Sequence, residues 1–376
     1  TMQIGSVKEI KRHEYRVGLT PSCARAYVNA GHTVRVQKAS GIDAGFEDDE
    51  YKAAGAILCT TPEEIWEASD MVVKVKEPQP DEYPMMREGQ ILYTYLHLAA
   101  DEMLTKEMIK RKVKGVAYET VETDSRSLPL LRPMSEIAGR MSIQEGARFL
   151  ERPQGGRGVL LGGIPSVEKG KVAILGGGVV GTHAAKMAVG LGADVTVLDV
   201  NIDRLNYLDD VFGGRVHLLY SNAAHLDLVL EQSDLIVGAV LIPGAKAPHL
   251  IKKDDLRRMK KGSVLVDVAV DQGGCIETTH PTTHDDPVFT IDDVVHYCVA
   301  NMPGGVSRTS TQALTTATLP YGLAIANKGL EEAARLNKEI ARGINTYDGK
   351  VTYRGVADAF GMNYVAAGDL IDGVEV

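Results

Sequence analysis

The segment 172–181 constrains the fold of this chain more than any other, because it joins an apolar run to a cluster of glycines. The run VAIL (172–175) is typical of a buried strand and leads into Gly176, Gly178 and Gly181, after which an alanine-rich stretch is typical of a helix. In such a strand–turn–helix, the first glycine permits the tight turn, the second lets the backbone approach a pyrophosphate, and the third lets helix and strand pack closely. The helix N-terminus then offers N–H groups to phosphates. The segment predicts a dinucleotide-binding α/β fold.

An acidic residue after the next apolar run indicates which dinucleotide binds. Asp199 follows the run VTVL (195–198). A carboxylate at this point accepts hydrogen bonds from a ribose 2′-hydroxyl and repels a 2′-phosphate, which favours NAD over NADP. Arg204 could receive a 2′-phosphate, but Asp199 occupies the discriminating position. We therefore expect NAD as cofactor, bound by Gly176, Gly178, Gly181, Asp199 and Arg204.

Apolar runs alternate with helical stretches on both sides of this segment. Six candidate strands lie between Lys171 and Ala300, at 172–175, 195–198, 216–219, 235–239, 264–268 and 295–299, which is the number in a full dinucleotide-binding sheet. The first 120 residues alternate in the same way, and the residues after 305 are mainly helical and too few to fold alone. We predict two Rossmann-like, doubly wound parallel-sheet domains flanking a cleft, with the cofactor domain inserted into the substrate domain. Residues 131–307 would form the NAD-binding Rossmann domain, and residues 1–130 plus 308–376 the substrate (catalytic) domain.

The composition argues against several classes of protein. With 41 basic and 50 acidic residues, the net charge of −9 lacks the basic footprint of a nucleic-acid-binding protein. No apolar stretch reaches the ~20 residues of a membrane span, and the N-terminal residues lack a secretory pattern, so we expect a cytoplasmic protein. The four cysteines lie in separate segments and predict neither a disulfide framework nor a zinc site. A metal site at HPTTH (280–284) is the less favoured interpretation, since proline and threonines there indicate a loop; we expect no metal.

Polar residues at the ends of apolar runs are the candidates for chemistry. Lys74 and Lys76 share one face of a predicted strand, and they are either solvated strand-end charges or cations at the crevice where α/β folds bind ligands. His97 ends the run ILYTYL (91–96) and is either a core histidine or a catalyst. Arg16 alone would be a surface residue, and Asp271 alone would be a turn former. Asp267 is expected to be structural.

Eight segments spread over the whole chain indicate that these residues serve one common function. They resemble, in the same order, segments of the alanine dehydrogenase family: EYRV (14–17), KVKEP (74–78), YLHLAA (95–100), PMSEIAGR (133–140), QGGRG (154–158), PGAKAP (243–248), DVAVDQGG (267–274) and ANMPG (300–304). The resemblance implies a reversible, NAD-dependent oxidative deamination of L-alanine to pyruvate and ammonium. It also implies a homo-oligomer, a hexamer in this family.

The resemblance also implies roles for individual residues. Arg16 would bind the substrate carboxylate, and Lys76 would supply a second positive charge near the carboxylate or the carbonyl. His97 and Asp271 would be the two acid–base groups, with their proton roles open to exchange. Further positions would line the nucleotide site: Ser135, Asp199, Ser221, Val240, Leu241, Asn301 and Met302.

Two other functions share parts of this pattern. The NAD(H)-binding subunit of a proton-translocating transhydrogenase has the same organisation but no amino-acid pocket, so it would have little use for the four substrate residues. A saccharopine-type dehydrogenase also joins an amine to a 2-oxo acid, but it needs a pocket for a long lysine-derived chain. Competition between substrates would separate these alternatives.

Overall fold

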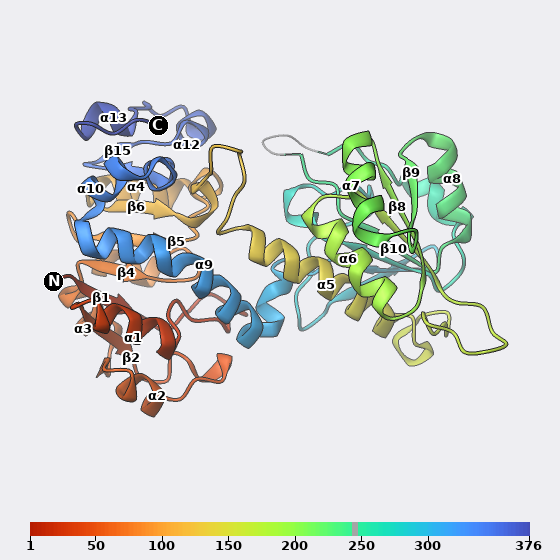
Figure 1. Cartoon of the computed structure of the whole chain (residues 1–376), viewed down its shortest axis with the longest axis horizontal. Coiled ribbons are helices and arrows are strands. Elements are labelled where there is room, and N and C mark those ends of the chain that lie inside the picture. The colour runs from red at the N-terminus through yellow and green to blue at the C-terminus, as the bar shows by residue number, and fades with distance from the viewer. Residues whose placement is uncertain (243–246) are drawn as a thin grey trace. The chain divides into compact units, whose positions relative to one another are not determined.

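The computed structural model describes residues 1–242 and 247–376, so part of the segment 243–248 lies outside the described residues. The chain divides into two compact units, one formed by Thr1–Pro133 with Val306–Val376 and the other by Met134–Gly305. Each unit is a sheet covered by helices (Figure 1). No helix of the described ranges is long and apolar enough to cross a membrane.

The first unit is built on an eight-stranded sheet with the order β15-β14-β6-β5-β4-β1-β2-β3. Strands β1 to β6 are parallel, β14 is antiparallel to β6, and β15 is antiparallel to β14. The strands are β1 (Gln3–Ser6), β2 (Thr33–Gln37), β3 (Ile57–Cys59), β4 (Met71–Val73), β5 (Ile91–Thr94), β6 (Lys114–Ala117), β14 (Ile344–Tyr347) and β15 (Lys350–Val351). The parallel part therefore has the doubly wound order 3-2-1-4-5-6, in which the chain reverses direction between β1 and β4. Such a switch point opens a crevice at the carboxyl ends of the strands.

Helices cover both faces of this sheet. They are α1 (Pro21–Asn29), α2 (Asp48–Ala53), α3 (Pro62–Ala68), α4 (Glu102–Lys110), α9 (Ser307–Lys328), α10 (Leu330–Leu336), α11 (Lys338–Gly343), α12 (Arg354–Phe360) and α13 (Ala367–Leu370). A threonine followed by proline predicts helix starts at Thr20 and Thr61. The structure confirms both, since Thr20 caps α1 by accepting from the N–H of Cys23 and Thr61 caps α3 by accepting from the N–H of Glu64. Pro320, expected to kink the C-terminal helix, lies inside α9, which is assigned as one continuous helix.

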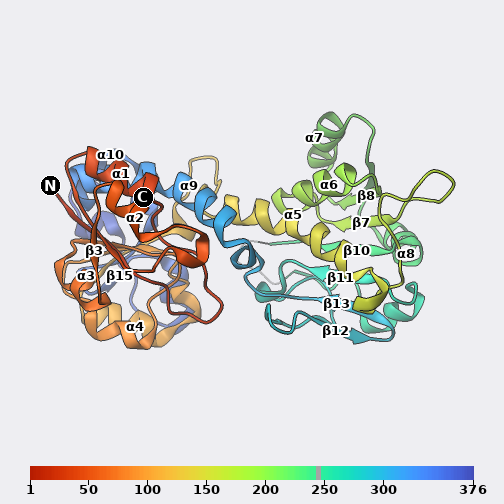
Figure 2. The same ribbon diagram turned by 90° about the horizontal axis from the view of Figure 1, so that it is seen from below.

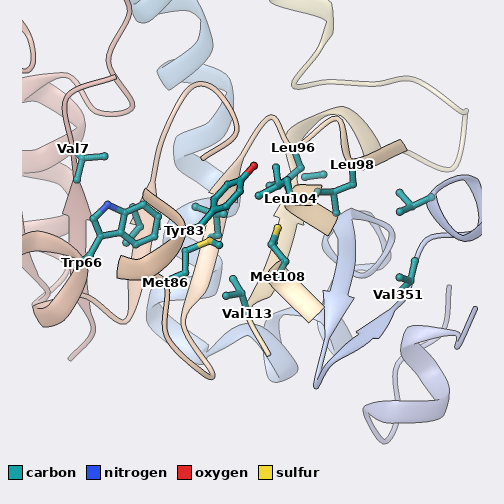
Figure 3. Packing of buried hydrophobic residues seen from close by; sticks show 14 of the residues in the cluster. Val7, Trp66, Tyr83, Met86, Leu96, Leu98, Leu104, Met108, Val113 and Val351 are labelled. Carbon is teal, nitrogen blue, oxygen red and sulfur yellow. The ribbon is translucent and has the colours of Figure 1, made fainter. Parts of the chain in front are cut away.

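The core on one face of this sheet joins segments far apart in the sequence. Figure 3 shows Trp66 of α3, Met86, Leu96, Leu104 and Met108 of α4 among the packed side chains, and all five are at most 2% exposed. Burying a large apolar side chain contributes about 1.5–3 kcal/mol relative to leaving it in water. The C-terminal segment adds Val351 and α12 to the same cluster. The tail thus packs on the N-terminal strands, as its small size predicts.

The second unit has a seven-stranded sheet with the order β12-β13-β11-β10-β7-β8-β9. Its strands are β7 (Lys171–Leu175), β8 (Asp194–Asp199), β9 (His217–Tyr220), β10 (Leu235–Gly238), β11 (Val264–Asp267), β12 (Val288–Ile291) and β13 (Val294–Tyr297). Figure 2 shows β8, β7, β10, β11, β13 and β12 following one another across the sheet. All neighbours are parallel except β12, which is antiparallel to β13. The switch point lies between β7 and β10.

The helices of this unit are α5 (Arg132–Phe149), which belongs to it from Met134 on, α6 (Val179–Gly190), α7 (Ile202–Phe212) and α8 (Ala223–Gln232). Helices α5 and α6 pack closely because a Cβ at Gly139 would come within 2.3 Å of the carbonyl oxygen of Val180. On the other face, Val229 and Leu230 of α8 pack on Ile236 and Leu265 of the sheet.

All six strands predicted for the second unit are present. The apolar runs of the first 120 residues predict five more strands, at 32–36, 56–59, 71–75, 91–96 and 115–118, and a short strand is predicted at 350–353; all six are present as well. The structure adds β1, β12 and β14, which the sequence interpretation missed. Strand β1 contains Gly5 and Ser6 and has little apolar character. Strands β12 and β14 lie at or near sheet edges and pair antiparallel with a neighbour. Such strands are held by their partners rather than by their own pattern.

Candidate active site

The carboxyl edge of the first unit's sheet carries four polar side chains of interest. Arg16 lies in the segment after β1, Lys76 after β4, His97 after β5, and Glu119 in a 3-10 turn (Tyr118–Thr120) after β6. Because β1, β4, β5 and β6 are neighbours and parallel, these four segments begin at one edge of the sheet. This edge is also where the switch point opens.

Arg16 is buried and paired with a carboxylate two residues earlier. Its Nε and Nη2 donate to the two oxygens of Glu14 at 2.8 and 2.6 Å, and both side chains are at most 2% exposed. Burial alone would raise the pKa of Glu14, but the guanidinium outweighs this effect and holds the pKa below its ordinary value. Arg16 thus presents a guanidinium fixed by a two-point ion pair, which is a geometry suited to carboxylate recognition.

Lys76 is half-buried, and its backbone is fixed by a carboxylate. The N–H groups of Val75 and Lys76 both donate to Oε1 of Glu9. The Nζ of Lys76 lies 5.9 Å from the centre of the Tyr95 ring. Burial and the nearby charge of Arg16 lower the pKa of Lys76. Glu14 and Glu77 raise the pKa but do not outweigh these two effects, so a bound anion would stabilise the charged form of Lys76.

Lys74, which the sequence pattern did not separate from Lys76, has a different environment. Its Nζ contacts Glu9 at 2.5 Å and Glu82 at 3.1 Å, with all three side chains nearly inaccessible. The strand ends at Val73, before both lysines, so the predicted shared strand face does not exist. The solvated alternative is wrong for Lys74, which is a structural cation in a buried network.

His97 is exposed and stands in a left-handed backbone conformation, with φ 48° and ψ 39°. Its ring lies 6.0 Å from the ring of Tyr95, measured between centroids. Tyr95 therefore neighbours both His97 and Lys76. Burial raises the pKa of Tyr95, and the nearby charge of Arg16 lowers it by a smaller amount. The structure thus brings Arg16, Lys76 and His97 together around Tyr95.

The sequence interpretation did not single out Tyr95. Its side chain is buried, its hydroxyl donates to the carbonyl of Leu130 at 2.5 Å, and its ring packs edge-on against Tyr118. The available signal was its position two residues before His97, on the same face of an extended segment. That signal becomes meaningful only when the neighbouring strand is known.

The glycine turn of the second unit has the geometry that a dinucleotide requires. Gly176 has φ +101°, and a Cβ on Gly181 would lie 1.8 Å from the carbonyl oxygen of Gly176. Gly178 differs, because a Cβ there would meet no atom of residues 1–242 and 247–376 within 4 Å. No side chain or backbone group in these ranges requires a glycine at Gly178, whereas the close approach of a pyrophosphate does. Gly178 also supplies no side-chain cap to α6, which leaves that helix end suited to an anion. The residues present fit NAD.

Asp199 stands beside this turn at the end of β8. Its Oδ2 accepts from the N–H of Gly177 at 2.7 Å and its Oδ1 from the N–H of Asn201 at 2.8 Å. Arg204 donates instead to the carbonyl of Gly177 and the hydroxyl of Thr182, at 2.5 and 2.9 Å. The arginine therefore supports the glycine turn, and the carboxylate of Asp199 lies beside the turn at the end of β8.

The other nucleotide candidates follow neighbouring strands of the same sheet. Ser221 follows β9, and its N–H donates to the carbonyl of Asp199 at 3.0 Å. Val240 and Leu241 follow β10, across the switch point from Gly176, and Asn301 and Met302 follow β13. Ser135 lies on α5. Apart from Ser135, these positions share one carboxyl edge of the sheet.

Asp271 is exposed in a short 3-10 turn (Val270–Gln272) after β11. The preceding Asp267 is fully buried and accepts from the hydroxyl of Thr279 at 2.5 Å and the N–H of Ala269 at 3.2 Å. Burial raises the pKa of Asp267 to about 6. Asp267 has the structural environment expected of it, at the base of the segment that carries Asp271.

The two histidines of the segment 280–284 have separate contacts. The ring of His280 stacks on Phe289 at 4.1 Å, and Nε2 of His284 lies 3.2 Å from the carbonyl oxygen of Asn301. Within residues 1–242 and 247–376, no three His, Cys, Asp or Glu side chains are placed to hold a metal ion together. The four cysteines are buried free thiols.

Comparisons with known proteins show the family to which the chain belongs. Residues 5–138 match the family model "Alanine dehydrogenase/PNT, N-terminal domain", and residues 142–354 match "Alanine dehydrogenase/PNT, C-terminal domain". The chain is 58% identical to alanine dehydrogenase 2 of Staphylococcus aureus (strain USA300) over 96% of this chain and 98% of that protein. The chain belongs to the alanine dehydrogenase family. As a member, it is an oxidoreductase and an NAD-dependent amino-acid dehydrogenase.

Solved structures agree with this membership. An L-alanine dehydrogenase structure matches with a TM-score of 0.94 and 54% identity, covering 96% of this chain and 99% of that one. A transhydrogenase from Sinorhizobium meliloti matches with a TM-score of 0.81 and 22% identity, covering 93% and 99%. The second likeness shows a common fold. A likeness of fold does not by itself carry a function.

Proposed function

We propose that this chain interconverts L-alanine, NAD and water with pyruvate, ammonium and NADH. Membership of the alanine dehydrogenase family supports this proposal. The observation that carries it furthest is the cluster around Tyr95, where a lysine lies 5.9 Å from the ring and a histidine ring 6.0 Å from it. A module that only presented a nucleotide would have no use for this cluster.

Arg16 and Lys76 bind the substrate in this proposal. The guanidinium of Arg16 receives the substrate carboxylate through two parallel N–H donors, and Lys76 adds a second cation. Burial and, after it, the charge of Arg16 lower the pKa of Lys76, so these two cations repel one another. A substrate carboxylate relieves this repulsion, which favours an anionic 2-oxo or 2-amino acid.

His97 and Asp271 move the protons. His97 exchanges a proton with the carbonyl oxygen of pyruvate as the carbinolamine forms and loses water. Asp271 orders the attacking ammonia or water and moves protons on nitrogen. Each group stands exposed in a short turn at the end of a buried strand, which suits a side chain that must reach a substrate.

Hydride transfer at the α-carbon of alanine is the chemistry that NAD would supply when bound. Gly176, Gly178 and Gly181 would hold its pyrophosphate at the N-terminus of α6, and Asp199 its ribose. Further residues assigned to this site are Ser135, Arg204, Ser221, Val240, Leu241, Asn301 and Met302. Residues 131–307 would thus be the NAD-binding domain, and residues 1–130 with 308–376 the substrate domain. We extend the family resemblance to a cytoplasmic homohexamer that acts in L-alanine catabolism.

The decisive experiment follows the absorbance of NADH after mixing the protein with pyruvate and ammonium. We expect turnover, and L-alanine with NAD should drive the reverse reaction. Lysine should not replace ammonium as the amine. A saccharopine-type dehydrogenase, by contrast, would need lysine. His97→Ala and Asp271→Asn should each abolish turnover while NADH still binds, as measured by its fluorescence. NADH binding without any turnover of the unaltered protein would favour the transhydrogenase-like function instead.

A further inference from the structure

His97 holds a backbone conformation that its surroundings must enforce. A non-glycine residue with φ 48° costs of the order of 1–3 kcal/mol and persists only where neighbouring contacts fix it. The residues on either side are anchored, since Leu96 and Leu98 are at most 1% exposed in the core of the first unit (Figure 3). The conformation turns the chain so that His97 faces outward between two buried leucines.

One carboxylate holds this turn. Oε1 of Glu119 accepts from the N–H of His97 at 2.6 Å and from the N–H of Leu96 at 3.1 Å, and its Oε2 lies 3.2 Å from the same Leu96 nitrogen. Glu119 stands after β6, the strand next to β5. Hydrogen bonds from N–H groups to an ionised carboxylate are about twice as strong as neutral ones. A residue far along the chain thus fixes the turn that carries His97.

The neighbouring strand end repeats this arrangement. Glu9 accepts from the N–H groups of Val75 and Lys76 after β4, as Glu119 does after β5. Glu9 is also part of the buried ion network with Lys74, so removing its carboxylate would disturb the core. Glu119 is only half-buried, and it is the carboxylate of the two that can be tested by substitution.

We propose that Glu119 is a positioning residue that sets the reach of His97 toward the substrate. This inference rests on the proposed function of His97 as an acid–base group. In Glu119→Gln, the amide oxygen can still accept from both N–H groups as Oε1 does, but these bonds lose the charge of the carboxylate, and the new NH₂ group faces the N–H of Leu96. The turn then relaxes, and His97 moves from its place. Since a displacement of about 1 Å can cost about 10²-fold in rate, we expect kcat to fall about 10- to 100-fold. The KM for NADH should not change.

The experiment measures kcat and KM of the full-length protein with pyruvate, ammonium and NADH. Glu122→Gln makes the same chemical change three residues along the chain and should behave as the unaltered protein. The thermal midpoint and NADH affinity of Glu119→Gln should stay close to those of this control. A kcat of Glu119→Gln equal to that of Glu122→Gln would overturn the inference.

A second background separates positioning from a general structural effect. His97→Gly removes the imidazole and tolerates positive φ at no steric cost, and added imidazole can restore measurable turnover. In that background we expect Glu119→Gln to change the rescued rate less than about threefold, since contributions that act through one residue are not additive. An equal loss in both backgrounds would show that Glu119 acts on something other than His97.

Two outcomes keep the inference distinct from the proposed function. Turnover by His97→Ala would refute the role of His97 itself. An inactive His97→Ala beside a fully active Glu119→Gln would refute only the positioning role. If Glu119→Gln does not fold, Glu119→Asp keeps the charge on a shorter side chain. It should lower kcat in the protein that retains His97 and not in the His97→Gly variant. A loss of the same size in the His97→Gly background would again contradict the proposal.

Discussion

The ammonium of Lys74 lies 2.5 Å from Oε2 of Glu9, and neither side chain is more than 2% exposed. Burial alone would lower the pKa of Lys74, but Glu9 and Glu82 outweigh it and keep the pKa above its ordinary value. Glu9 in turn holds the backbone of Lys76. A buried ion network therefore supports the strand end that carries a proposed substrate-binding residue.

Substitution of Lys74 should consequently reduce stability, whereas substitution of Lys76 should reduce catalysis. Lys74→Met leaves two buried carboxylates without their cation, so we expect a loss of about 3–5 kcal/mol in the free energy of unfolding. Lys76→Met should leave the fold intact and lower kcat/KM for pyruvate about 10²–10³-fold, as the loss of one well-placed electrostatic partner does. Urea titrations and steady-state kinetics of both variants would check this. Equal stability of the two variants would contradict the account of Lys74.

The glycines of the nucleotide turn form a second matched pair. Gly178→Ala places a methyl group where no atom of the described residues lies within 4 Å, so the variant should fold normally. It should bind NADH at least about tenfold more weakly, because the methyl group obstructs the pyrophosphate. Gly181→Ala places a methyl group 1.8 Å from a backbone oxygen and should destabilise the fold itself. Thermal unfolding and NADH fluorescence titrations distinguish the two effects. Unchanged NADH affinity of Gly178→Ala would mean that the coenzyme does not approach this turn.

Asp199 should determine the preference between the two nicotinamide coenzymes. Asp199→Ala removes the carboxylate that repels a 2′-phosphate, so the ratio of kcat/KM for NADH to that for NADPH should fall by about tenfold or more. The exposed Asp203 in the first turn of α7 provides the control, and Asp203→Ala should leave the ratio unchanged. An unaltered ratio in Asp199→Ala would assign the discrimination to another residue.

Asp267 should make the stability of the second unit depend on pH. Its pKa rises from 3.8 to about 6 because it is buried. Between these values the folded protein retains a proton that the unfolded chain has lost, so this contribution to stability decreases as pH rises through the window. The unaltered protein should thus gain up to about 3 kcal/mol relative to Asp267→Asn when the pH falls from 7 to 4. Urea titrations at these pH values would show it. A difference between the two proteins that does not vary with pH would contradict a protonated Asp267.

The amino-acid sequence by itself determined the local features of this protein. The caps at Thr20 and Thr61 and the turn at Gly176 depend on hydrogen bonds and dihedral angles within a few residues, so the chain specifies them wherever they stand. The sequence patterns likewise predicted twelve of the strands, because burial imposes its pattern on each strand separately. The resemblance to a family then supplied candidate residues whose individual patterns were ambiguous.

Only the tertiary structure decided which of these residues meet. Lys74 and Lys76 share one sequence pattern, yet Glu9 and Glu82 make one of them a core residue. Tyr95 and Glu119 acquire a role only because β5 lies between β4 and β6. Strand order is set by the packing of helices and sheet over the whole domain, and no local pattern encodes such long-range pairings. The sequence therefore specified the parts of the site, and the order of the strands assembled them.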